Sequence, residues 1–221
     1  MSALADTIRQ RLHGAADPSR APGQQAYMKS AMPYLGVAVP AVRAMTRAAA
    51  KGADLATLLT AADELWDAAT HREERYAAIG LIGMPAALGD RSTVPLIEHF
   101  ARTGQWWDFI DELAHRVSAL HDAHPAETAA LVRSWSNDPD FWMRRLAILS
   151  QLQRGQRTDP ALLANVITPN LANPEFFIRK GIGWALRDYA HTDPEWVRRF
   201  ASEHELSPLS RREALKHVGP A

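Results

Sequence analysis

The sequence predicts an all-α protein built of stacked helical repeats. Apolar residues recur at helical spacing along nearly all 221 residues, and no convincing alternating strand pattern interrupts them. Trp107, Trp142 and Phe177 lie at steps of 35 residues, a period typical of helical repeats. We therefore expect about a dozen short-linked helices that stack, HEAT-like, into a single α-solenoid domain over residues 1–221. The concave surface of such a solenoid is a natural groove for an extended ligand.

In the first half of the chain, residues that favour helix starts and helix ends indicate where the helices lie. An amphipathic pattern over residues 3–13 precedes a turn-rich linker over residues 17–23. Pro40 suits the first turn of the next helix, because its missing N–H would be unpaired there anyway, and Gly52 is expected to close that helix. Asp54 can then cap the following helix.

The later helices share one kind of start, a capping residue followed by a proline. These dipeptides are Asp138-Pro139, Asn173-Pro174 and Asp193-Pro194. For the last helix, Ser210 is expected to be the cap and Glu213 to complete a capping box. Basic residues in the first turn of that helix would oppose its dipole, which hints at an anionic partner.

Composition excludes several classes of protein. The chain has no cysteine, and therefore no disulfide or thiolate chemistry. It has no apolar run long enough to cross a bilayer and no secretory leader, so we expect a cytosolic protein without a membrane role. The 25 basic and 25 acidic residues argue mildly against nucleic acid. Arginine strongly outnumbers lysine, however, which suits contacts to phosphate or carboxylate.

No cofactor or metal is expected. The nine histidines form no convincing metal set. The chain also lacks a phosphate-cradling glycine loop and a Gly-x-Ser-x-Gly elbow, so nucleotide-dependent and ordinary hydrolase chemistry have no support.

Asp111 is the residue that the repeat does not explain. It follows Trp107 by one helical turn, so the two side chains share a face, whereas Leu146 and Gly181 occupy the equivalent positions of the next repeats. For an isolated pair, a core tryptophan beside a solvated acid is the ordinary interpretation. An acid set into a repeated aromatic face is nevertheless the best candidate for function.

Basic residues follow the aromatic residues in two successive repeats. Arg144 and Arg145 come after Trp142, and Arg179 and Lys180 come after Phe177. One arginine of the first pair should point to solvent and the other along the inner surface, which makes a basic track plausible. The alternative is an ordinary exposed helix face. Glycines on both sides of Ile182, just before Trp184, permit either close helix packing or space for a ligand.

Taken in order, these segments resemble the AlkD-type alkylpurine DNA glycosylases, a HEAT-like-repeat family of DNA alkylation repair enzymes. The resemblance covers nearly the whole chain. Its motifs are Tyr27-Met28-Lys29, Tyr34-Leu35-Gly36, Pro40 to Arg43, Glu64-Leu65-Trp66-Asp67, Trp106-Trp107-Asp108 with Asp111, Trp142-Met143-Arg144-Arg145, Ala147-Ile148-Leu149, Phe176-Phe177-Ile178, Gly183-Trp184 and Leu209 to His217.

The resemblance implies an active site of Trp107, Asp111, Arg145 and Trp184. The Asp111 carboxylate would stabilise positive charge that develops on the deoxyribose and would orient a water molecule. The tryptophan faces would attract the cationic sugar or lesion, and Arg145 would clamp a backbone phosphate. The implied concave face binds duplex DNA through further residues, namely Tyr27, Lys29, Arg144, Lys180, Arg187, Arg211, Arg212 and Lys216.

The implied activity is hydrolysis of the N-glycosidic bond of cationic purines such as 3-methyladenine and 7-methylguanine, without base flipping. Two alternatives are a non-catalytic paralogue that binds distorted or branched DNA, and a HEAT-repeat scaffold for proteins. Asp111 favours the enzyme, because a carboxylate near phosphates weakens the affinity of a pure DNA binder. We expect a monomer that is cytoplasmic and associates with the nucleoid when bound to DNA.

Overall fold

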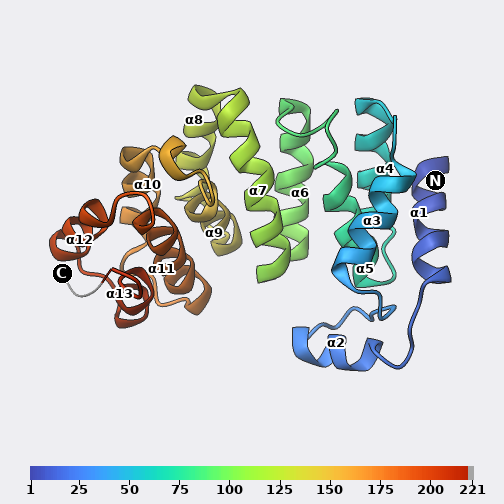
Figure 1. Cartoon of the computed structure of the whole chain (residues 1–221), viewed down its shortest axis with the longest axis horizontal. Coiled ribbons are helices and arrows are strands. Elements are labelled where there is room, and N and C mark those ends of the chain that lie inside the picture. Colours follow the sequence, from blue (N-terminus) through green and yellow to red (C-terminus); the bar gives the residue numbers. More distant parts are fainter. Residues whose placement is uncertain (219–221) are drawn as a thin grey trace. The chain divides into compact units, whose positions relative to one another are not determined.

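A computed structural model describes residues 1–218, and within them the fold is all-α (Figure 1). Thirteen α-helices and three 3₁₀ turns account for the regular structure of this part of the chain, which contains no strand. The helices are α1 (Ala3–Gly14), α2 (Ala21–Met28), α3 (Val39–Ala49), α4 (Leu55–Asp67), α5 (Arg72–Leu81), α6 (Val94–Gly104), α7 (Trp107–Ala123), α8 (Pro125–Trp135), α9 (Phe141–Leu149), α10 (Pro160–Ile167), α11 (Phe176–Ala190), α12 (Pro194–Glu203) and α13 (Pro208–Ala214), and the turns are η1 (Arg91–Thr93), η2 (Gly155–Arg157) and η3 (Thr168–Asn170). The predicted all-α, helical-repeat fold is confirmed.

The helices form two compact units, Met1–Phe100 and a second that begins at Ala101. The prediction of one domain over the whole chain stays a prediction. In the first unit α1, α3, α4 and α5 pack against one another. Trp66 is fully buried there and stacks on Phe100 with their ring centroids 4.3 Å apart. Each buried side chain of this size contributes about 1.5–3 kcal/mol to stability.

The Glu73 side chain of α5 accepts hydrogen bonds from the backbone of the loop that follows α2. This side chain is fully buried, and Oε2 accepts a hydrogen bond from the Leu35 N–H at 2.9 Å. Oε1 accepts from the Gly36 and Val37 N–H groups at 2.9 and 3.1 Å. Gly36 has φ +89°, and a side chain there would collide with the Asp17 carbonyl. The loop is therefore tied to the core through its backbone.

In the second unit, hydrogen bonds and packing contacts connect each helix pair to the next pair along the chain. There α7 packs on α8 and α9, α9 packs on α11, and α11 packs on α12 and α13. Hydrogen bonds join residues 34 or 35 positions apart, such as Arg145 to Asp111 and the Gln153 N–H to Asp188. The predicted period of 35 thus corresponds to the spacing between stacked helix pairs.

Two of the predicted helix starts lie too early. The N-cap of α9 is Asp140, because Asp138 accepts the N–H of Asp140 at 2.8 Å. Likewise, α11 begins after Glu175, whose N–H is bonded to Asn173 at 2.9 Å. In both places the side chain closes a local turn two residues on, and the helix starts only beyond it. The third start, Asp193 before α12, is confirmed by its side-chain bond to the first turn.

The start of α13 also differs from the prediction. Ser207 is the cap, and its Oγ accepts the N–H of Ser210 at 3.1 Å. Ser210 is therefore inside the helix, and Glu213 takes no part in a capping box. Arg211 and Arg212 lie in the last turn, where basic residues suit the negative end of the dipole. The predicted first-turn placement of these arginines is therefore wrong, and it no longer indicates an anionic partner.

The boundaries near the N-terminus hold with smaller changes. The predicted linker over residues 17–23 is shorter, because α2 begins at Ala21. Pro40 lies in the first turn of α3 as predicted, but Ala50 is the residue that ends this helix. Gly52 follows in the left-handed region, with φ +77°. Asp54 caps α4 as predicted, accepting the Thr57 N–H at 2.8 Å.

Candidate functional site

A cavity of about 420 Å³ in the second unit contains all the residues predicted to be catalytic. It is formed by α7, α9 and α11. Its lining comprises Trp107, Asp111, Arg145, Phe176, Phe177, Lys180, Trp184 and Arg187. Two of the side chains predicted to bind DNA, Lys180 and Arg187, therefore lie at the same place as the predicted catalytic group.

Asp111 and Arg145 form an ion pair between neighbouring repeats. The Nε and Nη2 atoms of Arg145 both donate to Oδ1 of Asp111, at 3.0 and 2.7 Å. Asp111 lies one turn into α7, and Arg145 lies at the corresponding height on α9. Oδ2 of Asp111 accepts no hydrogen bond from any residue in the described part of the chain. One oxygen is thus fixed, and the other is left for the cavity.

The position of Arg145 differs from the expected phosphate clamp. Its side chain is only 3% exposed. Besides the two bonds to Asp111, its Nη1 donates to the carbonyl oxygen of Phe177 at 2.5 Å. A buried guanidinium needs acceptors, and the acid one repeat away together with a helix carbonyl supplies them. Here Arg145 serves as a support for Asp111.

Burial raises the pKa of Asp111 to about 6, and the Arg145 guanidinium opposes this rise. The neighbouring Asp108 raises it further, to a smaller extent. The Asp111 carboxylate is therefore ionised in most molecules at pH 7, and its charge is held where water screens it poorly.

Trp107 and Trp184 lie on the cavity wall as half-buried side chains. Among residues 1–218, neither indole stacks on another ring. The aromatic cluster of the repeats is instead formed by Trp106, Trp142 and Phe177, with ring centroids 5.0 to 6.2 Å apart. Trp106, and not Trp107, is therefore the packing member of the series, so the face of Trp107 is left for the cavity.

Glu213 of α13 forms ion pairs with two basic residues at the edge of the cavity, Lys180 and Arg187. Its Oε1 lies 2.8 Å from Nζ of Lys180, and its Oε2 lies 2.7 Å from Nη1 of Arg187. The side-chain bond from Lys180 is the largest cause of the lowered pKa of Glu213. Close helix packing permits this arrangement, because a side chain at Gly183 would come within 2.5 Å of the Glu213 Cβ. The sequence pattern gave Glu213 a capping role, so its pairing here was missed.

The other two arginines of the predicted basic track are held by backbone carbonyls. Nη1 of Arg144 donates to the Asp138 oxygen at 2.8 Å, and Nε of Arg179 donates to the Asn173 oxygen at 3.0 Å. Each arginine thus bonds to the loop that precedes its own helix. Both side chains are half-buried, and neither lines the cavity.

The remaining predicted DNA-binding residues lie elsewhere on the chain. Tyr27 is 79% exposed, and Lys29 is exposed with φ 50°, both at the end of α2 in the first unit. Arg211, Arg212 and Lys216 are exposed in and just after α13. Arg211 bonds to the Ala201 oxygen at 2.6 Å. Phe176 was missed by the sequence interpretation of the site, although it lines the cavity and is 55% exposed.

Two groups of potential metal ligands occur among residues 1–218, and neither belongs to the cavity. They are His13 with His71 and Glu74, and Asp63 with Asp67 and His99. Oε1 of Glu74 already accepts from Arg9 at 3.0 Å, and its Oε2 accepts from the Thr70 N–H at 2.6 Å. We therefore assign Glu74 to an internal ion pair and a helix cap. No helix within residues 1–218 has the length and apolar character needed to cross a membrane.

The sequence pattern of the DNA alkylation repair enzymes matches residues 8–218. The chain belongs to this family. The predicted family is thereby confirmed, and the protein has a role as an enzyme of DNA alkylation repair. A DNA-binding function is implied by that role.

Two solved structures share the fold. A DNA alkylation repair enzyme of Enterococcus faecalis, itself a predicted one, is 29% identical and superposes with a TM-score of 0.81 over 93% of this chain and 98% of that chain. AlkD2 of Streptococcus mutans is 15% identical, with a TM-score of 0.67 over 89% of this chain and 98% of that chain, and shows likeness of fold alone. No curated protein sequence matches the chain.

Proposed function

We propose that the protein is a monofunctional DNA glycosylase. Its substrates would be cationic alkylated purines of the 3-methyladenine and 7-methylguanine type in duplex DNA, which it would release for base excision repair. The observation that best supports this proposal is the divided role of the Asp111 carboxylate, with Oδ1 held by Arg145 and Oδ2 unpaired beside the cavity.

The proposed reaction needs little from the protein at the leaving group. A purine alkylated at N3 or N7 carries a positive charge, so the C1′–N bond can break with its electrons neutralising the ring. The barrier is the positive charge that develops on the deoxyribose. The Asp111 carboxylate stabilises this charge electrostatically, as preorganised groups in other enzymes do. Its free Oδ2 orients a water molecule, whose oxygen bonds to C1′ while a proton passes to Asp111 and then to solvent.

The two tryptophans support the same charge. An indole face carries negative potential, and its attraction for a cation is worth about 0.5–2 kcal/mol. Trp107 and Trp184 have no ring partner among residues 1–218, so their faces are available for a cationic sugar or base. In this proposal Asp111 and the two tryptophans are the catalytic residues, and Arg145 is a positioning residue.

The edge of the cavity suits the DNA backbone. Lys180 and Arg187 lie there as a pair held by one carboxylate, so together with Glu213 they keep a net positive charge beside the Asp111 cavity. Phosphate contacts of this kind set the register of a protein on the duplex. We propose that the lesion stays in the base stack, because a reaction without acid catalysis on the base requires contact only with its sugar. This would be an exception to the usual extrusion of a target base.

Base release separates the proposal from its alternative, a paralogue that only binds distorted or branched DNA. Methylated duplex DNA would be incubated with the wild type and with Asp111→Asn, and free purines would be counted by chromatography. Glu112→Gln is the matched control, because Glu112 lies next to Asp111 in α7 but pairs with Arg116 outside the cavity. We expect release by the wild type and the control alone. A wild type that binds the duplex and releases no base would support the alternative.

We further propose that the protein acts as a cytoplasmic monomer at the chromosome, and without metal or cofactor. The chemistry above assigns every step to side chains of one chain and water. Activity that disappears on treatment with a chelator would contradict this part of the proposal.

A further inference from the structure

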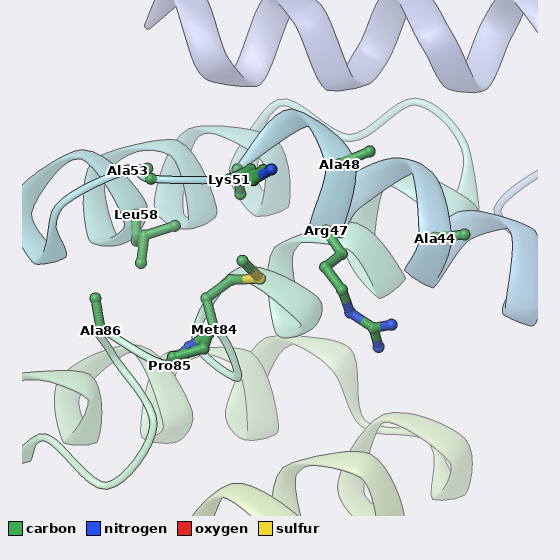
Figure 2. A pocket seen from close by; sticks show the side chains of 11 residues that line it. Ala44, Arg47, Ala48, Lys51, Ala53, Leu58, Met84, Pro85 and Ala86 are labelled. Carbon is green, nitrogen blue, oxygen red and sulfur yellow. The ribbon is translucent and has the colours of Figure 1, made fainter.

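A second cavity, of about 650 Å³, lies within the first unit (Figure 2). The C-terminal half of α3 and the start of α4 form one side of it, and the segment after α5 forms the other. None of the residues assigned to DNA or to the reaction lines it. A ligand bound here would therefore be independent of the proposed glycosylase activity.

Small apolar side chains create this space. Ala44 and Ala48 are one turn apart on α3 and both line the cavity, and Ala53 lies beyond the turn at the end of that helix. Leu58 and Met84 add larger apolar side chains to the lining. Larger side chains at the alanine positions would fill part of the cavity.

Two cations border this apolar surface. Arg47 lies on α3 and Lys51 follows it by one helical turn, and both line the cavity and are exposed. Neither is paired with an acid or bonded to another group within residues 1–218. No acidic residue in the described part of the chain lines the cavity, and the nearest acid along the chain, Asp54, caps α4 and accepts the Thr57 N–H. The charged side chains of the lining, Arg47 and Lys51, are thus both positive.

We propose that this cavity binds a small amphiphilic anion. The apolar body of the ligand would cover the alanines, and a single carboxylate would lie between Arg47 and Lys51. The volume falls within the range of about 300–1,000 Å³ that is usual for small-molecule sites. An apolar body gains from burial, and a carboxylate gains from charge-assisted bonds to two cations. Duplex DNA would use the cations but leave the alanine surface uncovered, so it fits the site less well.

The test uses the full chain, labelled with ¹³C at alanine and methionine methyl groups, and sodium decanoate as the probe. Titration should shift the methyl signals of Ala44, Ala48, Ala53 and Met84, which line the cavity. Decanol, which has the same chain length and no charge, should bind about tenfold more weakly, because a charge-assisted bond is lost. Absence of these shifts, or equal binding of decanol, would overturn the proposal.

Variants with matched controls locate the ligand. Arg47→Gln should weaken decanoate binding about tenfold, whereas Arg11→Gln, an exposed cation on α1, should leave it unchanged. Ala48→Leu should abolish binding by filling the cavity, and Ala41→Leu, exposed on α3 but outside the cavity, should not. Circular dichroism confirms that each variant is folded. If Ala48→Leu binds like the wild type, or if only a short DNA duplex shifts these methyl signals, the site does not bind small anions.

Discussion

Arg145 holds only one oxygen of Asp111: its Nε and Nη2 both donate to Oδ1, at 3.0 and 2.7 Å. A bidentate pair with one nitrogen on each oxygen would have occupied the whole carboxylate. The two bonds to Oδ1 fix the orientation of the Asp111 carboxylate and leave Oδ2 without a hydrogen-bond partner among residues 1–218, so Oδ2 is available to a water molecule or a substrate. Arg145 itself is nearly inaccessible, so its effect on the reaction is expected to pass through Asp111.

The rate of base release should depend on the ionisation of Asp111. The pKa of this group is raised to about 6 by burial, so the active carboxylate is lost as pH falls through that value. The single-turnover rate should therefore rise between pH 5 and 7 with an apparent pKa of about 6. The rate of spontaneous release from DNA alone provides the baseline. A flat profile over this range would exclude Asp111 as the titrating group.

Replacement of Arg145 should move this pH profile. The guanidinium lowers the pKa of Asp111 against the effect of burial, so Arg145→Gln should shift the midpoint of the rate profile to higher pH. The rate at pH 7 should fall, and duplex affinity should change little because Arg145 is only 3% exposed. A loss of affinity with an unmoved midpoint would instead restore Arg145 to the role of a phosphate clamp.

Arg187 should contribute to duplex affinity through charge. If it contacts a phosphate, Arg187→Gln should weaken binding equally for all sequences and reduce the slope of log K against log salt by about 0.9. Fluorescence anisotropy at several salt concentrations measures both quantities. Arg157→Gln is the control, because Arg157 is exposed and paired with Asp122 away from the cavity. Identical slopes for the two variants would remove Arg187 from the DNA interface.

Glu73→Gln should destabilise the first unit. The carboxylate accepts bonds from three backbone N–H groups in the wild type, whereas an amide keeps only one oxygen as acceptor. Leaving buried donors unpaired costs about 1–3 kcal/mol each, so the urea midpoint should drop clearly. Glu203→Gln, on the exposed end of α12, should leave the midpoint unchanged. Equal midpoints would mean that this loop is held by other contacts.

His121 should make the protein sensitive to acid. Burial, followed by the nearby Arg154, lowers its pKa to about 4, so the folded protein keeps the ring neutral while the unfolded chain binds a proton below about pH 6.5. The free energy of unfolding should consequently fall as pH decreases from about 6.5 to 4. Asp111, whose pKa is raised, has the opposite sign, and its contribution is lost as pH rises through about 6. His121→Gln should reduce the acid slope, measured by urea unfolding at each pH, and an unchanged slope would exclude His121 as its source.

Periodic spacing predicts the repeat, whereas the four principal residues, Trp107, Asp111, Arg145 and Trp184, were implied by the family resemblance; they line one cavity, and their roles stay a prediction. Residues 34 or 35 apart meet on neighbouring helices, and this brings Arg145 to Asp111. Periodic spacing does not predict which hydrogen-bond or ion-pair partner each polar side chain has. The partner is the acceptor that lies within hydrogen-bond distance. Asp138, for example, accepts the N–H of Asp140, so the helix begins after Asp140 and not after Asp138. For the same reason Glu213 pairs with Lys180 across two helices.

The aromatic series illustrates a second limit. The period of 35 indicates Trp107 as the member of this series, yet the adjacent Trp106 is the residue that contacts Trp142 and Phe177. The packing of the α7 start on Trp142 and Phe177 places Trp106 inward and leaves Trp107 at the cavity. The small-residue cavity beside Arg47 has no periodic signal at all, because it results from the absence of larger side chains.

The most direct test of the central claim is the single-turnover excision of 7-methylguanine from a defined duplex at saturating protein and pH 7.5. We expect measurable release by the wild type and a loss of about 10²–10³-fold in Asp111→Asn, with duplex affinity retained. Release at equal rates by both proteins, or by neither above the spontaneous rate, would contradict it.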